Sequence, residues 1–240
     1  MARFSPDQLA YAATLAGYLD RQRSLDFLTQ MQIRMSVGHW SAGDFCDRFA
    51  PPGYHSDDVQ FRNDFEGQCR RTRAAGIDAI EIHQSVFEKT LNGDLDCGAI
   101  ERARNGYIAE LEMTVPACNI NTWTHPKFRL GGPCNPDPAL RRAALEEILK
   151  GVEICRILKI PVLSVWPGSD GADYHFQIDY RQSIEWFTEA LVTVNRRCVE
   201  HGIRLAIEPK PYEPRELYMI IPTAAAAIVV AQRVNQECGG

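Results

Sequence analysis

The chain has 240 residues, 45% of them hydrophobic and 24% charged, with a net charge of -5 and a pI near 5.7. This length and composition predict a globular protein with a sizeable core. The acidic balance argues against nucleic acid as a partner, because binding to phosphates depends on Lys and Arg. We find no apolar run of the roughly 18 residues that a membrane span needs, so a membrane partner is not expected either.

Cysteine usage and the N-terminal pattern bear on the cellular compartment. Eight cysteines are scattered along the chain without a Cys-x-x-Cys pair. The first residues alternate polar and apolar side chains at helical spacing, unlike the continuous apolar run of a signal peptide. Together these features predict unpaired thiols in a cytoplasmic protein.

The chain begins with a pattern typical of a helical arm, at roughly residues 5–31. We therefore expect an arm over residues 1–32 and one larger domain over 33–240. Short apolar segments rich in β-branched residues predict five strands in the larger domain. They lie at 33–40, 77–83, 113–123, 162–166 and 203–210.

Helical patterns alternate with these strands. They lie at 57–75, 97–112, 137–158, 179–201 and 223–236. Gly76 and Gly202 follow two of them, and Asp137-Pro138 supplies a cap and a first-turn proline for another. The acidic pair at 57–58 is expected to open the first of these helices.

The strand starts are 36–49 residues apart, which leaves room for one strand, one helix and two loops in each unit. Such βα repetition predicts an α/β fold. A (β/α)8 TIM-barrel type is favoured over a doubly wound sheet, because no Gly-x-Gly-x-x-Gly follows the first strand. A closed barrel has eight strands in about 250 residues. With about five βα units, the barrel is predicted to be incomplete, unless the arm or the Pro-rich loops hide further strands.

Chemically active side chains gather at the predicted C-terminal ends of the strands, where a barrel carries its active site. Three of the four tryptophans fall there, and aromatic walls exclude water and stack on the apolar faces of sugars. The candidates are His39, Trp40, His83, Asn121, Trp123, His125, Trp166, Glu208 and Lys210.

Glu208 and Lys210 are two residues apart on a predicted strand, so they should share one face. A carboxylate there suits Mg²⁺ or Mn²⁺, and a lysine suits an oxygen that gains negative charge during a reaction. A buried Glu-Lys ion pair without any substrate is the structural alternative. His83 could likewise be a core histidine rather than a catalytic one.

Other charged residues are interpreted as solvated. Glu147 and its neighbour Glu146 fall in a predicted helix with Arg141 and Lys150 at helical spacing, which is typical of an exposed face. The histidines at positions 55 and 175 are expected in polar loops.

Several motifs carry a resemblance to a known family. EPKPYEPRELYMIIPTAAAAIVV, at 208–230, resembles the xylose isomerase motif in which E-P-K-P-x-E-P follows the fifth strand. NTWTHPKFRLGG at 121–132 and VWPGSDGADY at 165–174 resemble that family's loops after the third and fourth strands, and GHW at 38–40 resembles its first-strand G-x-W. From about residue 33 to 235, the chain is similar to xylose isomerase-like TIM barrels and apparently lacks the last three βα units.

The resemblance implies a divalent-metal-dependent aldose-ketose isomerase of a small sugar, and a homo-oligomer. In that family two divalent cations, Mg²⁺ or Mn²⁺, hold the open-chain sugar while a hydride moves between adjacent carbons. The implied site residues are Glu208 as a metal ligand, Lys210 and His83 as catalytic groups at the substrate oxygen and in ring opening, and Trp40, Asn121, Trp123 and Trp166 as substrate-binding residues.

The sequence departs from the family in three places. His83 is followed by Gln84, Ser85 and Val86 in place of a run of aspartates, and the loop after Trp166 lacks the family's Arg-Glu. The remaining metal ligands of the family belong to strands six to eight, which are not present in this chain. The chain alone is therefore expected to be inactive, because one carboxylate cannot hold two such cations.

Other functions remain open from the sequence. A sugar or sugar-phosphate epimerase on the same barrel would use proton transfer by two carboxylates in place of a hydride shift, and it is favoured if a second glutamate near Glu208, rather than Lys210, is essential to turnover. A non-catalytic sugar-binding or assembly fragment would use its open sheet edges to associate. A DNA-repair endonuclease is the least favoured, since it needs a basic surface and a histidine-rich metal site.

Overall fold

The computed structural model describes residues 4–15, 20–43, 60–212 and 218–239. By internal packing the chain divides into two units, Met1–Ser36 and Val37–Gly240. Several predictions fall outside the described residues: Cys46, His55 and the start of the helix expected from residue 57.

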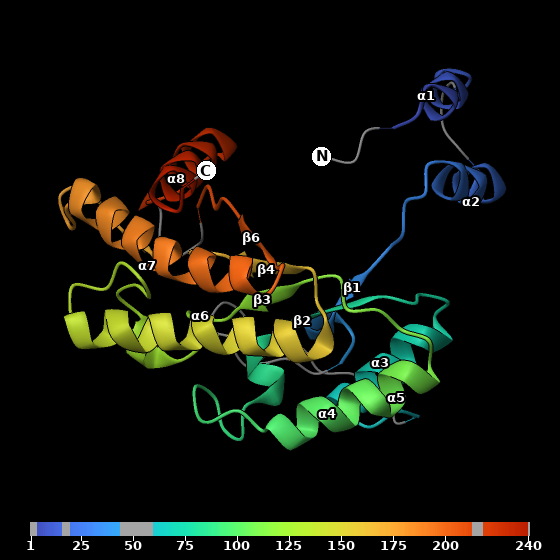
Figure 1. Cartoon of the computed structure of the whole chain (residues 1–240), viewed down its shortest axis with the longest axis horizontal. Helices are drawn as coiled ribbons and strands as arrows, with labels where there is room; N and C mark the ends of the chain where they lie inside the picture. The colour runs from blue at the N-terminus through green and yellow to red at the C-terminus, as the bar shows by residue number, and fades with distance from the viewer. Residues whose placement is uncertain (1–3, 16–19, 44–59, 213–217, 240) are drawn as a thin grey trace. The chain divides into compact units, whose positions relative to one another are not determined.

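The first unit contains two short helices, α1 (Pro6–Ala13) and α2 (Arg21–Gln30), drawn in blue in Figure 1. Ser5 and Gln8 form a reciprocal capping box at the start of α1. The Gln8 side chain donates a 3.1 Å hydrogen bond to the Gln30 carbonyl. The arm predicted as one helical segment is therefore a pair of short helices that contact each other.

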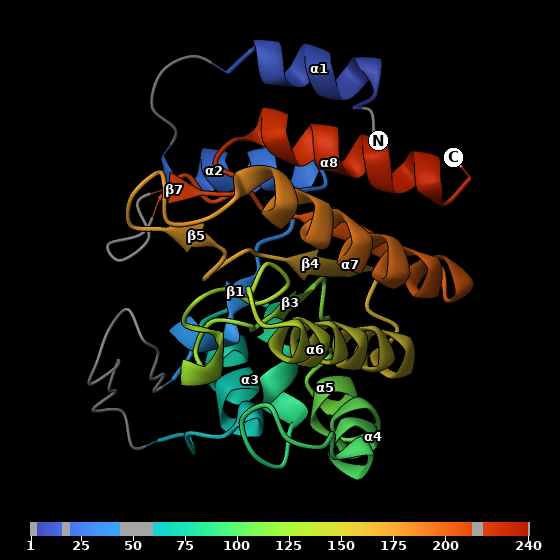
Figure 2. The same cartoon turned by 90° about the vertical axis from the view of Figure 1, so that its left-hand side faces the viewer.

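The second unit is built on a five-stranded parallel sheet, with strands adjacent in chain order (Figures 1 and 2). All five predicted strands are present, and the TIM-barrel type is confirmed; in the described residues the sheet is not closed, and its edges are the first and last of these strands. The strands are β1 (Val37–Gly38), β2 (Ile80–His83), β3 (Cys118–Ile120), β4 (Val162–Val165) and β6 (Arg204–Ile207).

The helices follow the predicted alternation. They are α3 (Phe65–Ala74), α4 (Cys97–Asn105), α5 (Tyr107–Glu110), α6 (Pro138–Leu158), α7 (Tyr180–Glu200) and α8 (Ala224–Glu237), with 3₁₀ turns η1 (His39–Ser41), η2 (Gln84–Phe87) and η3 (Pro126–Phe128). Two short antiparallel strands, β5 (Gly171–Ala172) and β7 (Tyr218–Met219), were not predicted.

Local capping fixes most helix starts. Asp137 and Asp179 accept backbone N–H bonds at the starts of α6 and α7, as the sequence indicates. Within the described residues α3 begins at Phe65, because the carboxylate of Asp64 accepts the N–H of Gly67 and caps the helix there. The expected helix 97–112 is interrupted at Gly106, which ends α4 and precedes α5.

Side chains alternate between the two faces of the sheet. One set, which includes Ile82, Ile120 and Leu163, belongs to the apolar core that also contains residues of α6 and α7. Figure 2 shows these two helices along the sheet, with α8 packed on α7. The other set includes Glu81 and His83, so the face of the sheet that corresponds to a barrel interior is polar. This polar face is where the strands present their chemistry.

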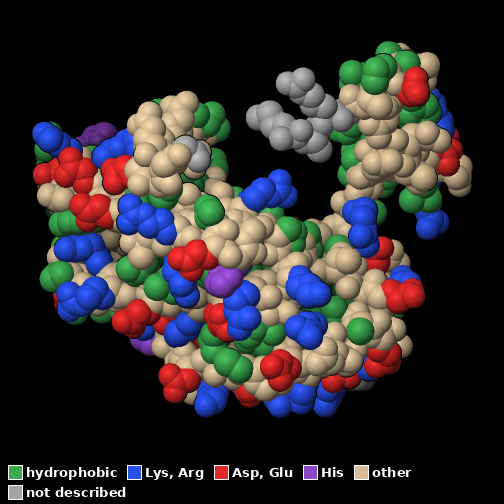
Figure 3. Space-filling model, in the orientation of Figure 1, with side chains coloured by type: hydrophobic (Ala, Val, Ile, Leu, Met, Phe, Trp, Pro, Cys, Tyr) green, Lys and Arg blue, Asp and Glu red, His purple; other side chains and the backbone are tan. Residues whose placement is uncertain are grey.

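Two surface observations concern the remaining sequence expectations. Among the described residues, no helix is long and apolar enough to cross a membrane. On the face of the second unit drawn in Figure 3, basic and acidic side chains are interspersed rather than gathered. Such a surface gives phosphate backbones no concentrated positive patch on this face.

Candidate active site

A row of rings crosses the C-terminal ends of the strands. Trp40 stacks on His83, with ring centroids 4.4 Å apart and planes 8° from parallel, and His39 meets His83 edge-on at 4.8 Å. Trp123 meets His83 edge-on at 5.1 Å and Trp166 at 4.5 Å. Four successive strands thus contribute to one aromatic wall, which brings together residues as far apart in the sequence as His39 and Trp166.

Two glycines make this close packing of rings possible. A Cβ atom at Gly38 would overlap the ring of Trp40, and one at Gly168 would lie 2.9 Å from the side chain of Trp123. Real Cβ atoms do not approach other groups so closely without a local shift. The G-x-W and W-P-G sequences therefore contribute space as well as rings.

Lys210 ends the row. Its side chain is only 2% exposed, and the Nζ atom donates a 2.6 Å hydrogen bond to the Gly168 carbonyl. The same atom lies 4.4 Å from the centroid of the Trp166 ring, at cation-π distance. The backbone N–H of Lys210 bonds the Ile221 carbonyl at 2.9 Å. An ammonium group is thus buried beside the aromatic wall, shielded from solvent.

Glu208 has a different environment from Lys210, although the two were expected to share a face: Glu208 is exposed. Desolvation raises the pKa of the Glu208 carboxyl, and the charge of nearby Glu81 raises it further. Asn119 donates a 3.2 Å hydrogen bond to Glu81. Sequence reasoning missed Glu81, although period-two alternation places it on the same face of β2 as His83.

Both histidines of the row are neutral at pH 7. Burial lowers the pKa of His39 to about 4, against a smaller opposing effect of its hydrogen bond with Gln68. Burial and the proximity of His39 hold the pKa of His83 well below its ordinary value. A neutral imidazole can accept a proton from a hydroxyl group, which an imidazolium cannot.

Asn121 is buried and organises the loop after β3. Its Oδ1 atom accepts the N–H groups of Trp123 at 3.4 Å and Thr124 at 3.1 Å. The Gln84 side chain forms two hydrogen bonds with the backbone of Asn121: it accepts the N–H at 2.7 Å and donates to the carbonyl at 3.1 Å. Gln84, one of the departures from the family's aspartate run, therefore joins the loops that carry His83 and Trp123.

Asp170 joins a further pair of loops and was not singled out from the sequence. It is 1% exposed, and its Oδ1 accepts the N–H groups of Gly132 at 3.0 Å and Cys134 at 2.8 Å. Its carbonyl accepts the N–H of Ile220 at 3.1 Å. Burial raises the pKa of its carboxyl despite these hydrogen bonds. Asp170 thereby ties the loop after β4 to the loop after β3 and to the segment that follows β7.

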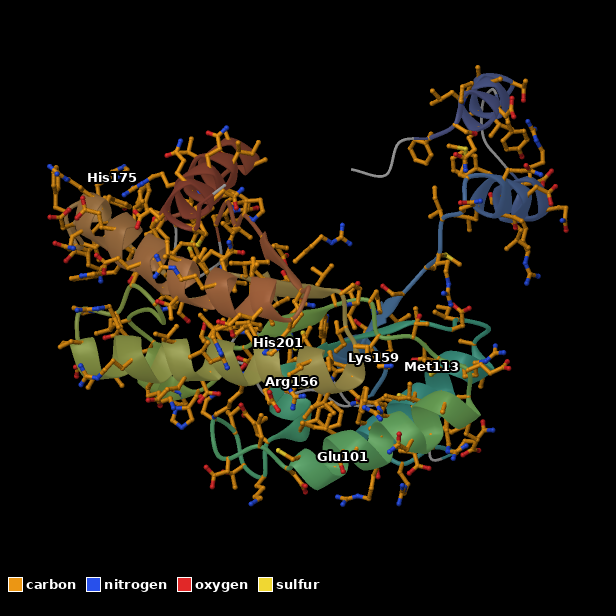
Figure 4. The ribbon with its side chains drawn as sticks, in the orientation of Figure 1. Glu101, Met113, Arg156, Lys159, His175 and His201 are labelled. Atoms are coloured by element: carbon orange, nitrogen blue, oxygen red, sulfur yellow. The ribbon has the colours of Figure 1, made fainter. Side chains whose placement is uncertain are left out.

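The candidate His125, and His175, which was expected to be solvated, lie apart from these ring contacts. His125 accepts the N–H of Lys127 at 3.1 Å and caps η3. His175 lies in the loop before α7 and packs on Tyr218, with ring centroids 3.9 Å apart. Figure 4 labels His175 and His201 at opposite ends of α7. His175 therefore belongs to the side of the strands' C-terminal ends, as expected for a loop that follows β4.

Two carboxylates, those of Glu208 and Glu81, lie near each other beside the row of rings. Glu208 and Glu81 bring two carboxylates close enough for one charge to affect the other, which is a donor set that a hard cation prefers. In the part of the chain that the structure describes, no three His, Cys, Asp or Glu side chains are grouped to hold a metal ion. Residues 213–217 of the E-P-K-P-x-E-P motif lie outside the described residues.

Several solved structures share this fold. They include a D-psicose 3-epimerase in the presence of D-fructose (TM-score 0.55, 17% identity, 71% of this chain and 54% of that one) and an L-ribulose 3-epimerase (0.56, 17%, 84% and 57%). The IOLI protein with a bound zinc atom is similar at a TM-score of 0.56 and 13% identity, over 84% of this chain and 59% of that one. The chain thus spans little more than half the length of each, and at these identities the likeness concerns the fold.

The sequence match is more specific. Residues 69–239 match the family described as xylose isomerase-like TIM barrel. This range contains His83, Trp123, Trp166, Glu208 and Lys210, and it includes all strands of the parallel sheet except β1. The chain belongs to the xylose isomerase-like TIM barrel family.

Proposed function

We propose that this chain carries the sugar-binding part of a divalent-metal-dependent aldose-ketose isomerase acting on a small sugar. The observation that supports this most is the aromatic wall that ends on buried Lys210. Rings bind the apolar faces of a sugar and exclude water, and a buried ammonium stabilises an oxygen that becomes negative.

In the proposed reaction the open-chain aldose lies along Trp40, Trp123 and Trp166. The C2 hydride moves with its electron pair to C1, C2 becomes the carbonyl carbon, and the proton of the C2 hydroxyl ends on the C1 oxygen. Lys210 donates a hydrogen bond to the oxygen that gains charge. Neutral His83 accepts a hydroxyl proton while the sugar ring opens. Asn121 positions the Trp123 loop against the substrate.

The cations proposed are Mg²⁺ or Mn²⁺, and Glu208 is the proposed ligand. Bound divalent cations polarise substrate oxygens. Glu81 adds a second negative charge beside Glu208 and so favours cation binding there. The further oxygen ligands that two such cations require would come from the substrate, from waters or from groups beyond the described residues.

Glu81 also supports the alternative function, epimerisation by proton transfer. Two carboxylates near one substrate carbon can remove a proton on one face and return one on the other. The sequence hypothesis for an epimerase asks for a second glutamate near Glu208 that is essential to turnover, and Glu81 is the candidate for that residue. The two functions differ in which residue is essential: Lys210 for the hydride shift, Glu81 for the proton transfer.

Isotope labelling distinguishes the two reactions. The protein purified from its native source is incubated with Mn²⁺ and a panel of aldoses deuterated at C2. A hydride shift carries the deuterium to C1 of the ketose, whereas proton transfer exchanges it with water. Retention of the label supports the isomerase and washout supports the epimerase. Quenching of tryptophan fluorescence by sugars, without turnover, would favour a binding role. If the sugars cause no quenching and no turnover occurs, the proposal is overturned.

Matched variants assign the residues. For the isomerase, Lys210→Met should lower kcat by about 10²–10³-fold, and Glu81→Gln should leave the label on carbon. For the epimerase, Glu81→Gln should be the variant that lowers kcat, and Lys210→Met should have the smaller effect. Glu153→Gln is the control, because Glu153 pairs with Arg156 on the exposed face of α6.

The remaining proposals concern the state of the protein. We propose a cytoplasmic homo-oligomer, which light scattering of the native protein would test. The seven described cysteines are free, in keeping with a reducing compartment.

A further inference from the structure

A buried cluster of charges lies behind the loop that follows β2, and its position corrects the sequence interpretation. Glu147 was expected on a solvated face of its helix, yet its side chain is only 3% exposed. Residues 88–95 form a tight hairpin with a β-bridge between Glu88 and Leu95, and the hairpin covers this part of α6. The side chain of Glu88 is fully buried against it.

Lys150 holds the hairpin to α6. Its Nζ atom lies 2.9 Å from Glu147 Oε1 and 3.7 Å from Glu88 Oε1, and it donates a 2.6 Å hydrogen bond to the Gly93 carbonyl at the hairpin tip. The second Glu88 oxygen accepts the backbone N–H of Asn92 at 2.6 Å. The two buried carboxylates thus share one ammonium group and one backbone N–H as their close donors.

The hydrogen bonding of the cluster is incomplete without a proton. Glu88 Oε1 and Glu147 Oε2 are buried, and in the described residues neither accepts a hydrogen bond. Glu88 and Glu147 lie within hydrogen-bonding reach of each other, and two buried carboxylates at that distance repel. A proton on one of them supplies the missing donor and removes the repulsion.

The other charged groups around the pair are few. The Nζ atom of Lys127, in η3, lies 4.0 Å from Glu147. The charge of Glu147 also acts on the pKa of His125 in the same loop, where burial is the larger effect and lowers that pKa. Burial and Glu147 raise the pKa of Glu88 to about 8, against the smaller effects of Asn92 and Lys150. Near neutral pH the cluster therefore keeps one proton.

The 88–95 hairpin follows the proposed site directly in the sequence. Glu88 directly follows η2, whose first residue, Gln84, grips the backbone of Asn121 and follows His83. A movement of Glu88 away from α6 would pull on this turn.

We propose that Glu88, Glu147 and Lys150 form a protonated latch that holds the 88–95 hairpin on α6 and thereby positions η2, with His83 and Asn121, for substrate. Its link to catalysis rests on the proposed function, but the latch itself does not. The three are positioning residues. Opening the hairpin exposes Glu88 to water, where its carboxyl loses the proton, so opening is favoured as the pH rises.

Hydrogen-deuterium exchange of the native protein between pH 5.5 and 9.5 tests the latch without any sugar. After correction for intrinsic exchange, protection of residues 84–96 should fall by up to tenfold per pH unit toward pH 8 and then level off. Glu88→Gln, which keeps the size and a donor but carries no titrating proton, should make this protection independent of pH. Glu147→Gln gives a second variant should the first fold poorly.

Glu153→Gln, at an exposed pair on the same helix, is the control and should keep the wild-type profile. A wild-type profile that is flat between pH 5.5 and 8, or the same slope in Glu88→Gln, would overturn the latch. Where the protein turns over sugar, the pH dependence of kcat/KM should change in Glu88→Gln, with little change in Glu153→Gln. Loss of the exchange effect refutes the latch, whereas absence of turnover refutes only the proposed function.

Discussion

The neutral state of His39 has a measurable effect on stability. The imidazole is 6% exposed and edge-on to His83, and its pKa is lowered from the ordinary 6.5 to about 4. Unfolding exposes it to water, where it binds a proton at higher pH than in the folded protein. The unfolded state therefore binds more protons between pH 6.5 and 4, so the stabilising contribution is complete above pH 6.5 and is lost as the pH falls.

The size of this effect follows from the two pKa values. A pKa of about 4 in place of 6.5 favours the neutral imidazole by about 3 kcal/mol at most. Integrated from pH 7 down to pH 4.5, His39 alone should lower the free energy of unfolding by about 2 kcal/mol. His83, whose pKa is lowered in the same direction, adds to the loss.

The assay is urea unfolding of wild type and His39→Gln at pH 7 and pH 4.5. The variant keeps a polar side chain with a donor and an acceptor but cannot titrate. Carboxylates elsewhere titrate in both proteins, so the difference between the two profiles isolates the histidine. The variant should lose about 2 kcal/mol less than wild type on acidification. Equal losses would mean that His39 is not kept neutral by burial, and the reasoning about the ring row would fail.

Three further predictions test the packing and polar contacts around the site. Lys210→Met should lower the free energy of unfolding by about 1–3 kcal/mol, because it leaves the buried Gly168 carbonyl without its donor; an unchanged or raised value in urea would show that this hydrogen bond does not stabilise the fold. Gly151→Ala should destabilise, because a methyl group there would overlap the Ile120 side chain and overpacking costs about 1–3 kcal/mol, more than the roughly 1 kcal/mol that alanine gains over glycine in a helix; a rise in Tm would contradict it. Asp170→Ala should cost about 2–4 kcal/mol by leaving two buried N–H groups without an acceptor, while Asp170→Asn should retain most of the stability; similar losses in both would refute the acceptor role.

Local chemistry explains which parts of the fold could be predicted from the sequence. Asp137 and Asp179 cap their helices through contacts two or three residues away, and Gly202 ends α7 with a φ of +68°. Such signals act within one turn of chain. The strands were predicted too long because apolar composition continues past their ends. The strand predicted over 203–210 ends at Ile207, and Pro209 within that range has no N–H to donate to a ladder.

The parts that could not be predicted depend on contacts between distant segments. Glu147 has the helical spacing of a solvated residue, and only the hairpin more than fifty residues earlier buries it. Asp170 is similar, because the N–H groups that donate to its carboxylate come from the loop after β3. Residues at the strand ends were found more easily, since parallel strands bring their C-terminal ends to one edge whatever lies between them. Glu81 lies on the same face but two residues before the end of β2.

The two buried clusters titrate with opposite signs, and a double variant can separate them. The contribution of Glu88, whose pKa is raised to about 8, is complete below its ordinary value of 4.5 and is lost as the pH rises toward 8. Between pH 4.5 and 6.5 this loss opposes the gain from His39. The free energy of unfolding of the wild type should therefore change less with pH than either group alone would make it change. Glu88→Gln should therefore steepen the rise of stability with pH in this range, His39→Gln should turn it downward, and the double variant should lie between them. Effects of the single variants that have the same sign would show that burial does not hold one group protonated and the other neutral.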